Sequence, residues 1–245
     1  MNTMKKILAA LLCAALAASL AACAAKPAAN SAASASKAAG TSGAGSSGES
    51  ASDAPDGGWS YNQGELSLDG NADAKAAFEK ATAGLTGYTY TPVALIGSQV
   101  VAGTNYCILC NAAPVTPNAE STYVLLYIFA DLNGGAEITG TKDFAAASDS
   151  SEPIVGGLEM NQGETAVEQN ADVKAAFDKA LDGLVGCSYE PVAYLGSQVV
   201  AGTNYLLLCR TTPVVPNAVS AFSLVTIYAD LSGNAELTDV TDLAI

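Results

Sequence analysis

Histidine is absent from this sequence of 245 residues. A chain without imidazole has no Ser-His or Cys-His nucleophile pair and no His-ligated zinc site. Basic residues are scarce as well, since 10 Lys and Arg stand against 24 Asp and Glu and give a formal net charge of −14. So acidic a chain repels phosphate backbones, and nucleic acid is therefore not an expected partner. We expect no enzyme activity, no cofactor and no bound metal.

The first residues have the pattern of an export signal rather than of a folded element. Two lysines precede an apolar run over 7–20, which is shorter than the roughly 20 residues of a membrane-spanning helix. The run ends in Leu20-Ala21-Ala22-Cys23, which resembles a bacterial lipobox. The resemblance implies cleavage before Cys23 and a diacylglycerol on its thiol; a plain secretory signal with a chance Cys is the alternative. We expect 1–22 to be a lipoprotein signal peptide and the mature protein to be extracytoplasmic, lipid-anchored to the cell membrane or cell surface.

Two stretches have the composition of linkers. Residues 24–56 are almost entirely Ala, Ser, Gly, Lys, Asp and Pro, with no aromatic side chain and no aliphatic one larger than Ala. Such a segment buries too little apolar surface to order itself. We therefore predict a flexible tether over 23–56, with a root-mean-square reach of about 30 Å for a random coil. Residues 143–156, rich in Ala, Ser and Asp, are predicted to be a second linker.

The rest of the chain is an internal repeat. The ten residues from Gly97 to Tyr106 and from Gly196 to Tyr205 are identical, GSQVVAGTNY, at an offset of 99 residues (196 − 97 = 99). The same offset aligns the two copies elsewhere without a gap. Each copy has roughly 85 residues, enough for a core of its own. We therefore predict two tandem domains, at 57–142 and 157–245.

Both copies have the same predicted order of elements. Asn71 suits a helix N-cap, and apolar residues at helical spacing predict a helix to about Leu85, with Gly87 following its end. Short or alternating apolar segments predict strands at 66–68, 90–98, 104–112, 122–130 and 136–139. The predicted class is α+β, with one helix packed across an antiparallel β-sheet in each of the two domains.

Four cysteines lie within the repeats. Cys107 and Cys110 spell C-x-x-C inside a predicted strand, where positions i and i+3 point to opposite faces. We therefore do not expect these two to pair. For Cys187 and Cys209, a disulfide is one alternative and buried reduced thiols are the other.

The segment that connects the first two long predicted strands carries a family resemblance. Gln99-Val100-Val101-Ala102-Gly103, followed by Thr-Asn-Tyr, resembles the first inhibitory hairpin of the cystatins and stefins, which inhibit cysteine proteases. The order of elements around it is similar too, over 58–141 and 157–240. The resemblance implies tandem cystatin-like domains in a bacterial lipoprotein, with papain-like cysteine proteases as partners. The membrane is the other expected partner, to which the lipid on Cys23 would anchor the protein.

Three segments form the inhibitory wedge in that family: a glycine near the N-terminus, the QxVxG hairpin, and a second hairpin that usually bears Pro-Trp. Here the second hairpin departs from the pattern, with Asp131-Leu132-Asn133-Gly134 and Asp230-Leu231-Ser232-Gly233 in its place. A large aromatic contact is lost and a carboxylate is gained. By resemblance, the candidate inhibitory residues are Gly58, Gln99, Val100, Val101, Ala102, Gly103 and Leu132, and in the second copy Gly157, Gln198, Val199, Val200, Ala201, Gly202 and Leu231.

The residue types of the hairpin suit this role. Gly103 adopts the backbone of a tight turn at little steric cost, the valines are small and uncharged, and Gln99 offers an amide to a partner's backbone. The alternative is a non-catalytic, non-inhibitory protein-binding or adhesion module on the cell surface, which the missing Pro-Trp favours. A passive spacer is the third reading. The carboxylates near Asp131 lack the ligand set of a calcium loop, so we expect a plain turn there.

Overall fold

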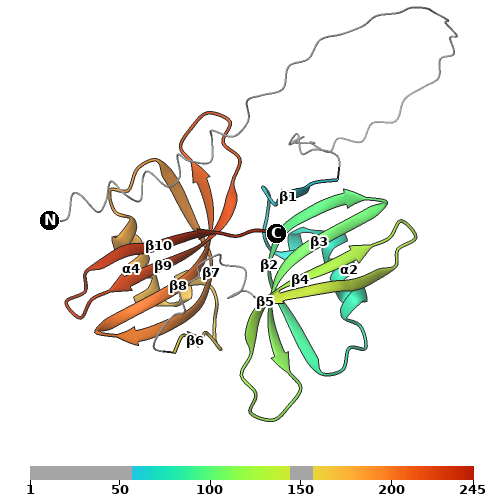
Figure 1. Ribbon diagram of the computed structural model, residues 1–245, viewed down its shortest axis with the longest axis horizontal. Helices are drawn as coiled ribbons and strands as arrows, with labels where there is room; N and C mark the ends of the chain where they lie inside the picture. The colour runs from blue at the N-terminus through green and yellow to red at the C-terminus, as the bar shows by residue number, and fades with distance from the viewer. Residues whose placement is uncertain (1–56, 144–156) are drawn as a thin grey trace, which may run out of the picture.

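The computed structural model describes residues 57–143 and 157–245 (Figure 1). The predicted signal peptide over 1–22, the lipidation site Cys23 and the tether to residue 56 lie outside the described residues. So does the predicted linker over 143–156, except for Asp143, which is the last residue of the strand Ala136–Asp143. Within the described ranges, no helix is long and apolar enough to cross a bilayer.

The two repeats contain equivalent elements. The first comprises β1 (Trp59–Tyr61), the 3₁₀ turn η2 (Leu68–Gly70), α2 (Ala72–Thr82), β2 (Tyr88–Val101), β3 (Gly103–Pro114), β4 (Thr122–Ala130) and β5 (Ala136–Asp143). The second comprises β6 (Glu159–Met160), η3 (Val167–Gln169), α4 (Ala171–Leu181), β7 (Cys187–Val200), β8 (Gly202–Pro213), β9 (Ala221–Ala229) and β10 (Ala235–Asp242). Each repeat forms one sheet in which neighbouring strands are consecutive in the chain and antiparallel.

The predicted fold class is wrong. Among the residues described, the chain is mostly β rather than α+β, with 49% strand, 16% helix, two five-stranded antiparallel sheets and only two helices, so the prediction of one helix packed across a sheet in each of two domains does not hold. The helices are short because Ala83 leaves the helical conformation and Gly84 has a positive φ of 75°. Leu85, expected on the buried face, lies beyond the helix end and is 43% exposed. The strands are long, since β2 and β3 run for 14 and 12 residues.

The start of each repeat also differs from the prediction. Leu66 to Leu68 was expected to be the first strand, but the sheet begins with Trp59–Tyr61, and Leu68 starts a 3₁₀ turn. Asn71 is the N-cap residue of α2, yet its side chain makes no capping bond. Its amide instead donates to the carbonyl oxygens of Glu65 and Ser67, at 2.8 and 2.7 Å. The Asn71 side chain therefore stabilises the turn before the helix rather than the first turn of the helix itself.

Side chains on one face of each sheet pack with the helix of the same repeat. In the first repeat, Ala74 and Phe78 of α2 share a buried cluster with Leu95, Ile108 and Leu126. Val173 and Phe177 of α4 belong to the corresponding cluster of the second repeat. The alternation of strand side chains leaves the neighbouring residues on the opposite face of each sheet.

Those opposite faces meet in one core that belongs to both repeats. Its buried members are Ala94, Ile96, Cys107, Leu109, Tyr123 and Leu125, together with Ala193, Leu195, Leu206, Leu208, Phe222, Leu224 and Leu243. Six pairs in this set are equivalent positions of the repeat, and the rings of Tyr61 and Phe222 approach to 5.9 Å across it. Both faces of the central strands are therefore buried, which accounts for the unbroken apolar run from Cys107 to Cys110.

Reciprocal hydrogen bonds border the shared core. The Gln63 amide donates to Ser220 O at 2.9 Å and accepts from Ser220 N at 2.9 Å. The equivalent Gln162 amide donates to Ser121 O at 2.9 Å and accepts from Ser121 N at 3.0 Å. Each repeat thus completes the backbone hydrogen bonding of the other by the same pair of contacts.

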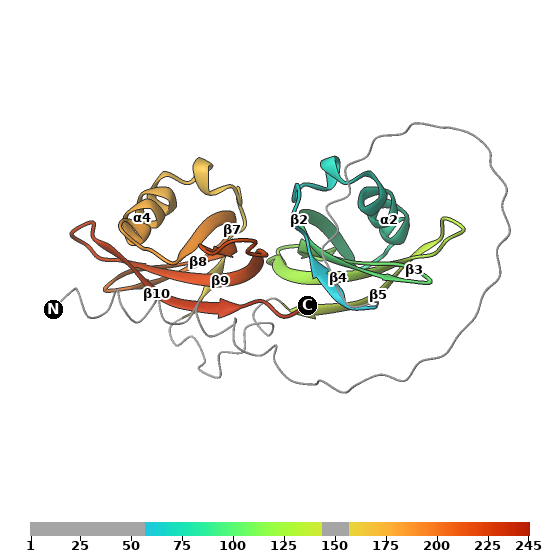
Figure 2. The same cartoon turned by 90° about the horizontal axis from the view of Figure 1, so that it is seen from above.

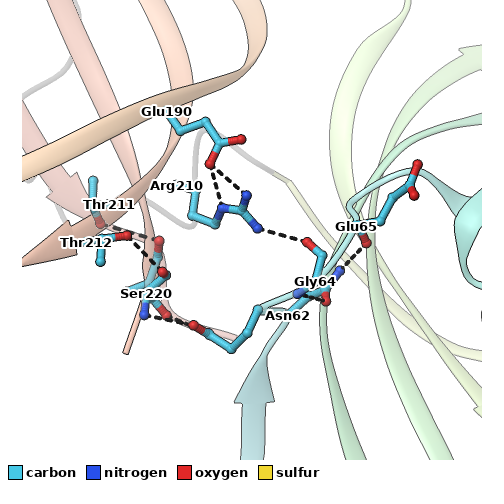
Figure 3. A network of polar contacts seen from close by, with 10 residues as sticks. Asn62, Gly64, Glu65, Glu190, Arg210, Thr211, Thr212 and Ser220 are labelled. Atoms are coloured by element: carbon cyan, nitrogen blue, oxygen red, sulfur yellow. Dashed lines mark hydrogen bonds and ion pairs between the residues drawn. The ribbon is translucent and has the colours of Figure 1, made fainter. Parts of the chain in front are cut away.

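The contact that Arg210 makes between the repeats has no counterpart at the equivalent position of the first repeat (Figure 3). The Arg210 guanidinium donates to Glu190 of its own repeat at 2.9 and 2.6 Å, and across the boundary to Gly64 O at 2.8 Å. The equivalent residue, Asn111, donates instead to Ser121 within its own repeat. The contacts between the repeats are therefore reciprocal in outline but not in every side chain.

The cysteines of the described residues form no disulfide. Cys107 points into the shared core and Cys110 to the helix side, which confirms that the C-x-x-C lies across two faces of a strand. Burial raises the pKa of Cys107 to about 12 and also raises that of Cys209. Of the two alternatives for Cys187 and Cys209, the structure has the reduced thiols. They lie at distant positions of the β7–β8 ladder, opposite Pro213 and Pro191 respectively.

Candidate functional site

Three segments of each repeat lie side by side at one end of its sheet. In the first repeat, β1 pairs with the end of β2 at Trp59 and Gln99, and the start of β3 pairs with the end of β4 at Thr104 and Ala130. This register brings together Gly58, the hairpin 99–103 and the hairpin 131–134. We call this set the first loop edge. The second loop edge is the equivalent set, namely Gly157, 198–202 and 230–233.

The tight turn of the β2–β3 hairpin depends on the glycine that follows it, Gly103. Gly103 has a φ of 140°, a conformation that residues with a Cβ rarely adopt. A Cβ at this position would also lie within 3.0 Å of the carbonyl oxygen of Ala130 and of the Phe129 ring. Gly202 has the same conformation and the same crowding. The predicted need for glycine therefore has a second cause, the close approach of the neighbouring strand.

Apolar side chains project from both hairpins of each loop edge. Val100 is 72% exposed and Leu132 is 83% exposed, and the equivalent Val199 and Leu231 are 76% and 88% exposed. Leu132 and Leu231 were candidate residues only by resemblance, and the strand register now places them on the hairpin next to the valines. Large exposed apolar side chains grouped on adjacent loops are typical of an interaction surface.

The glutamine of each hairpin is used inside the chain. The Gln99 amide donates to Gly57 O at 2.6 Å and accepts from the Asn105 amide at 2.7 Å. The equivalent Gln198 accepts from the Asn204 amide at 2.9 Å and is only 5% exposed. The hypothesis that Gln99 bonds a partner's backbone gains no support from this geometry. Its amide instead holds the start of the described chain against the hairpin.

The second hairpin of each loop edge is closed by its aspartate. Oδ1 of Asp131 accepts from the backbone N–H groups of Gly135 at 2.8 Å and Asn133 at 2.7 Å. These bonds to the ionised form hold the pKa of Asp131 below its ordinary value, and a side-chain bond from Asn234 is the main cause of the same shift in Asp230. No group of three or more potential metal ligands occurs among the residues described. This carboxylate shapes a turn.

We expect the 131–134 hairpin to loosen only in strong acid. The folded pKa of Asp131 lies below the unfolded one, so its stabilisation is fully present above about pH 4 and is lost as the pH falls through the folded value. The backbone amide NMR signals of Asn133 and Gly135 should therefore titrate below the ordinary aspartate range. Asp131→Asn should remove the titration, and a midpoint at or above pH 4 in the parent would contradict the assignment.

The two loop edges differ in one side chain that sequence reasoning missed. The Tyr228 hydroxyl donates to Ala201 O at 2.6 Å and so fixes the tip of the β7–β8 hairpin. The equivalent residue of the first repeat is Phe129, whose ring lies beside Gly103 without a hydroxyl to donate. The sequence does contain a sign of this difference, because Phe129 and Tyr228 are equivalent positions while the hairpin residues 99–103 and 198–202 themselves are identical.

Comparison with known proteins adds no family to this geometry. The sequence matches no protein-family model, and no curated protein matches it significantly. What the loop edges can do is therefore argued from their own residues.

Proposed function

We propose that this protein inhibits papain-like cysteine proteases, with a loop edge entering the active-site cleft of the enzyme as a preformed wedge. The observation that carries the proposal is the pair of exposed apolar side chains on two adjacent hairpins, Val100 and Leu132, repeated as Val199 and Leu231. Small uncharged side chains on narrow hairpins suit an apolar cleft. The resemblance of QVVAG to the inhibitory hairpin of the cystatins is the reason for proposing the cleft of a papain-like cysteine protease.

The backbone of the loop edge supports a rigid mode of binding. The β2–β3 hairpin is tied to the start of the chain through Gln99, and the 131–134 turn is closed by Asp131. The Lys80 ammonium of α2 also donates to Gly134 O, which ties the second hairpin to the helix. Loops that are ordered before binding lose little conformational entropy on association. A closed hairpin also presents no extended peptide for cleavage.

Inhibition should depend on the exposed valines. We expect Val100→Asp combined with Val199→Asp to weaken inhibition of papain and of a cathepsin L-type enzyme at least about 100-fold, or about 2.7 kcal/mol. The new aspartate would be buried at the centre of the interface without a partner for its charge, whereas the parent valine fills the cleft. The measurement is a titration of enzyme activity by each variant.

The chain supplies a matched control for this experiment. Val115 and Val214 are also exposed, but they lie past the ends of β3 and β8, at the opposite end of each sheet. Val115→Asp with Val214→Asp should leave inhibition unchanged. Equal potency of the Val100/Val199 variant and this control would count against the wedge.

A non-inhibitory binding module is the second candidate function. It is favoured by the internal use of the Gln99 amide and by the turn at Asp131 in place of a large aromatic contact. The same loop edges would then hold a partner protein or a cell-surface ligand. A folded parent protein that fails to inhibit papain at high micromolar concentration would favour this candidate.

We further propose that the protein is held at the membrane by a diacylglycerol on Cys23. The lipobox-like residues before it support this, and two acyl chains supply the two signals that stable anchoring needs. We expect Cys23→Ala to abolish incorporation of a labelled fatty acid in a bacterial host and to move the protein out of the membrane fraction. Cys13→Ala, within the apolar run, is the matched control and should retain both. Label on the Cys23→Ala protein would contradict the assignment.

A further inference from the structure

We infer that one chain holds two papain-like protease molecules at the same time, one at each loop edge, and so bridges them. This inference rests on the proposed function and adds to it a stoichiometry and a fixed geometry. It follows from how the repeats are joined and from where their loop edges point.

The two repeats form one rigid body rather than two domains joined by a flexible linker. Thirteen buried residues from both repeats make the shared core. Leu243, which follows β10, is 1% exposed in that core, and its carbonyl accepts from the Tyr61 hydroxyl of the first repeat. Gln63, Gln162 and Arg210 add hydrogen bonds across the boundary. Moving one loop edge relative to the other would break these contacts.

The loop edges lie at opposite ends of this body. In Figure 2 the β4–β5 hairpin and the start of β3 project to one side, and the β9–β10 hairpin projects to the other. Figure 1 shows the same separation from a direction at right angles. The residues at the centre are the other ends of the sheets, where Ser121 and Ser220 contact the partner repeat. The shared core therefore lies between the two loop edges.

This arrangement decides which complexes are available. An enzyme seated on the first loop edge extends away from the second, so the two binding events do not obstruct each other. One enzyme molecule does not reach both edges, because the folded repeats lie between them. The two edges therefore bind independently, and joining them raises the apparent affinity only for targets on a shared surface.

A sandwich assay tests the inference. Biotinylated papain is immobilised, the protein carrying Cys23→Ser is bound to it, and fluorescent papain is then added. We expect the second papain to be retained at close to one per bound chain, and a 2:1 papain complex by native mass spectrometry. Affinity for the second papain should lie within about twofold of that for the first.

Variants of a single loop edge provide the controls. Val100→Asp with Leu132→Asp disables the first edge, and Val199→Asp with Leu231→Asp disables the second. Each should still bind immobilised papain but retain no second papain. Retention of no second papain by the parent, or loss of all binding in one of these variants alone, would overturn the inference and leave inhibition standing. A parent that binds no papain would overturn the proposed function itself.

Discussion

Replacing Phe222 by alanine is expected to destabilise both repeats together, by about 3–5 kcal/mol, although the residue belongs only to the second. Phe222 is fully buried in the shared core and its ring lies against Tyr61 of the first repeat. Removing it leaves a cavity that borders both sheets. Because neither sheet covers that face by itself, we expect the two repeats to unfold in one transition.

The sequence contains a convenient probe for this coupling. Trp59 is the only tryptophan, lies in the first repeat and packs against the shared core, with its ring 5.6 Å from that of Tyr127. Denaturation followed by Trp59 fluorescence therefore reports on the first repeat, and circular dichroism reports on both. In the Phe222→Ala variant both curves should shift to lower denaturant by the same amount.

Leu231→Ala is the control for this prediction, because Leu231 is almost fully exposed and its truncation should change the free energy of unfolding by less than about 0.5 kcal/mol. A Phe222→Ala protein whose Trp59 transition stays in place, while the circular dichroism curve splits in two, would show that the repeats fold separately.

Gly202→Ala is the second substitution with a large expected effect, a loss of about 3 kcal/mol together with inhibition by the second loop edge. The φ of 138° strains any residue with a Cβ, and the new methyl would meet the carbonyl oxygen of Ala229 and the Tyr228 ring. The carbonyl oxygen of Ala229 is a backbone atom, so no side-chain rotation relieves this contact. The hairpin must shift, and Tyr228 loses its bond to Ala201 as it does so.

Gly233→Ala separates strain from crowding. Gly233 also has a positive φ, 77°, but a Cβ there would meet nothing within 4 Å. Its loss should be about 1 kcal/mol, the ordinary strain of the left-handed region. Thermal unfolding of the two variants side by side measures the difference, and equal losses would contradict the crowding argument. It also follows that glycine variants of the hairpin report on folding, so binding is better tested at the exposed valines.

The local features of the fold could be predicted from the sequence. Alternation predicted the strand around Ile108, and a run of β-branched and aromatic residues predicted the strand around Leu125. Helical spacing predicted a helix containing Ala74 and Phe78, and the glycines marked the turns. These signals depend on near neighbours. The first strand was missed because three residues, Trp59–Tyr61, are too few for a period and pair only through the register with β2.

The class and the shared core could not be predicted in the same way. The helices end earlier and the strands run longer than predicted, and this difference makes the chain mostly β. Where a helix or strand ends depends on tertiary contacts that sequence patterns do not report. The apolar run at Cys107–Cys110 did carry a signal for burial on both faces. Nothing in the sequence distinguished the Gln63 amide, which crosses to Ser220, from that of any surface glutamine. Of the candidate site residues, Val100 and Val199 are exposed on their hairpins, whereas Gln99 lies in an internal hydrogen-bond network.

The reciprocal glutamine–serine pairs have the geometry of an isologous homodimer interface, contained here within one polypeptide. In a true homodimer every substitution at the interface occurs twice, once in each subunit. In a fused chain each position changes alone. Arg210 uses this freedom, since it reaches Gly64 O from one side while Asn111 occupies the equivalent place. Covalent fusion thus lets the two halves of a symmetric interface diverge, and with them the two surfaces that the interface holds apart.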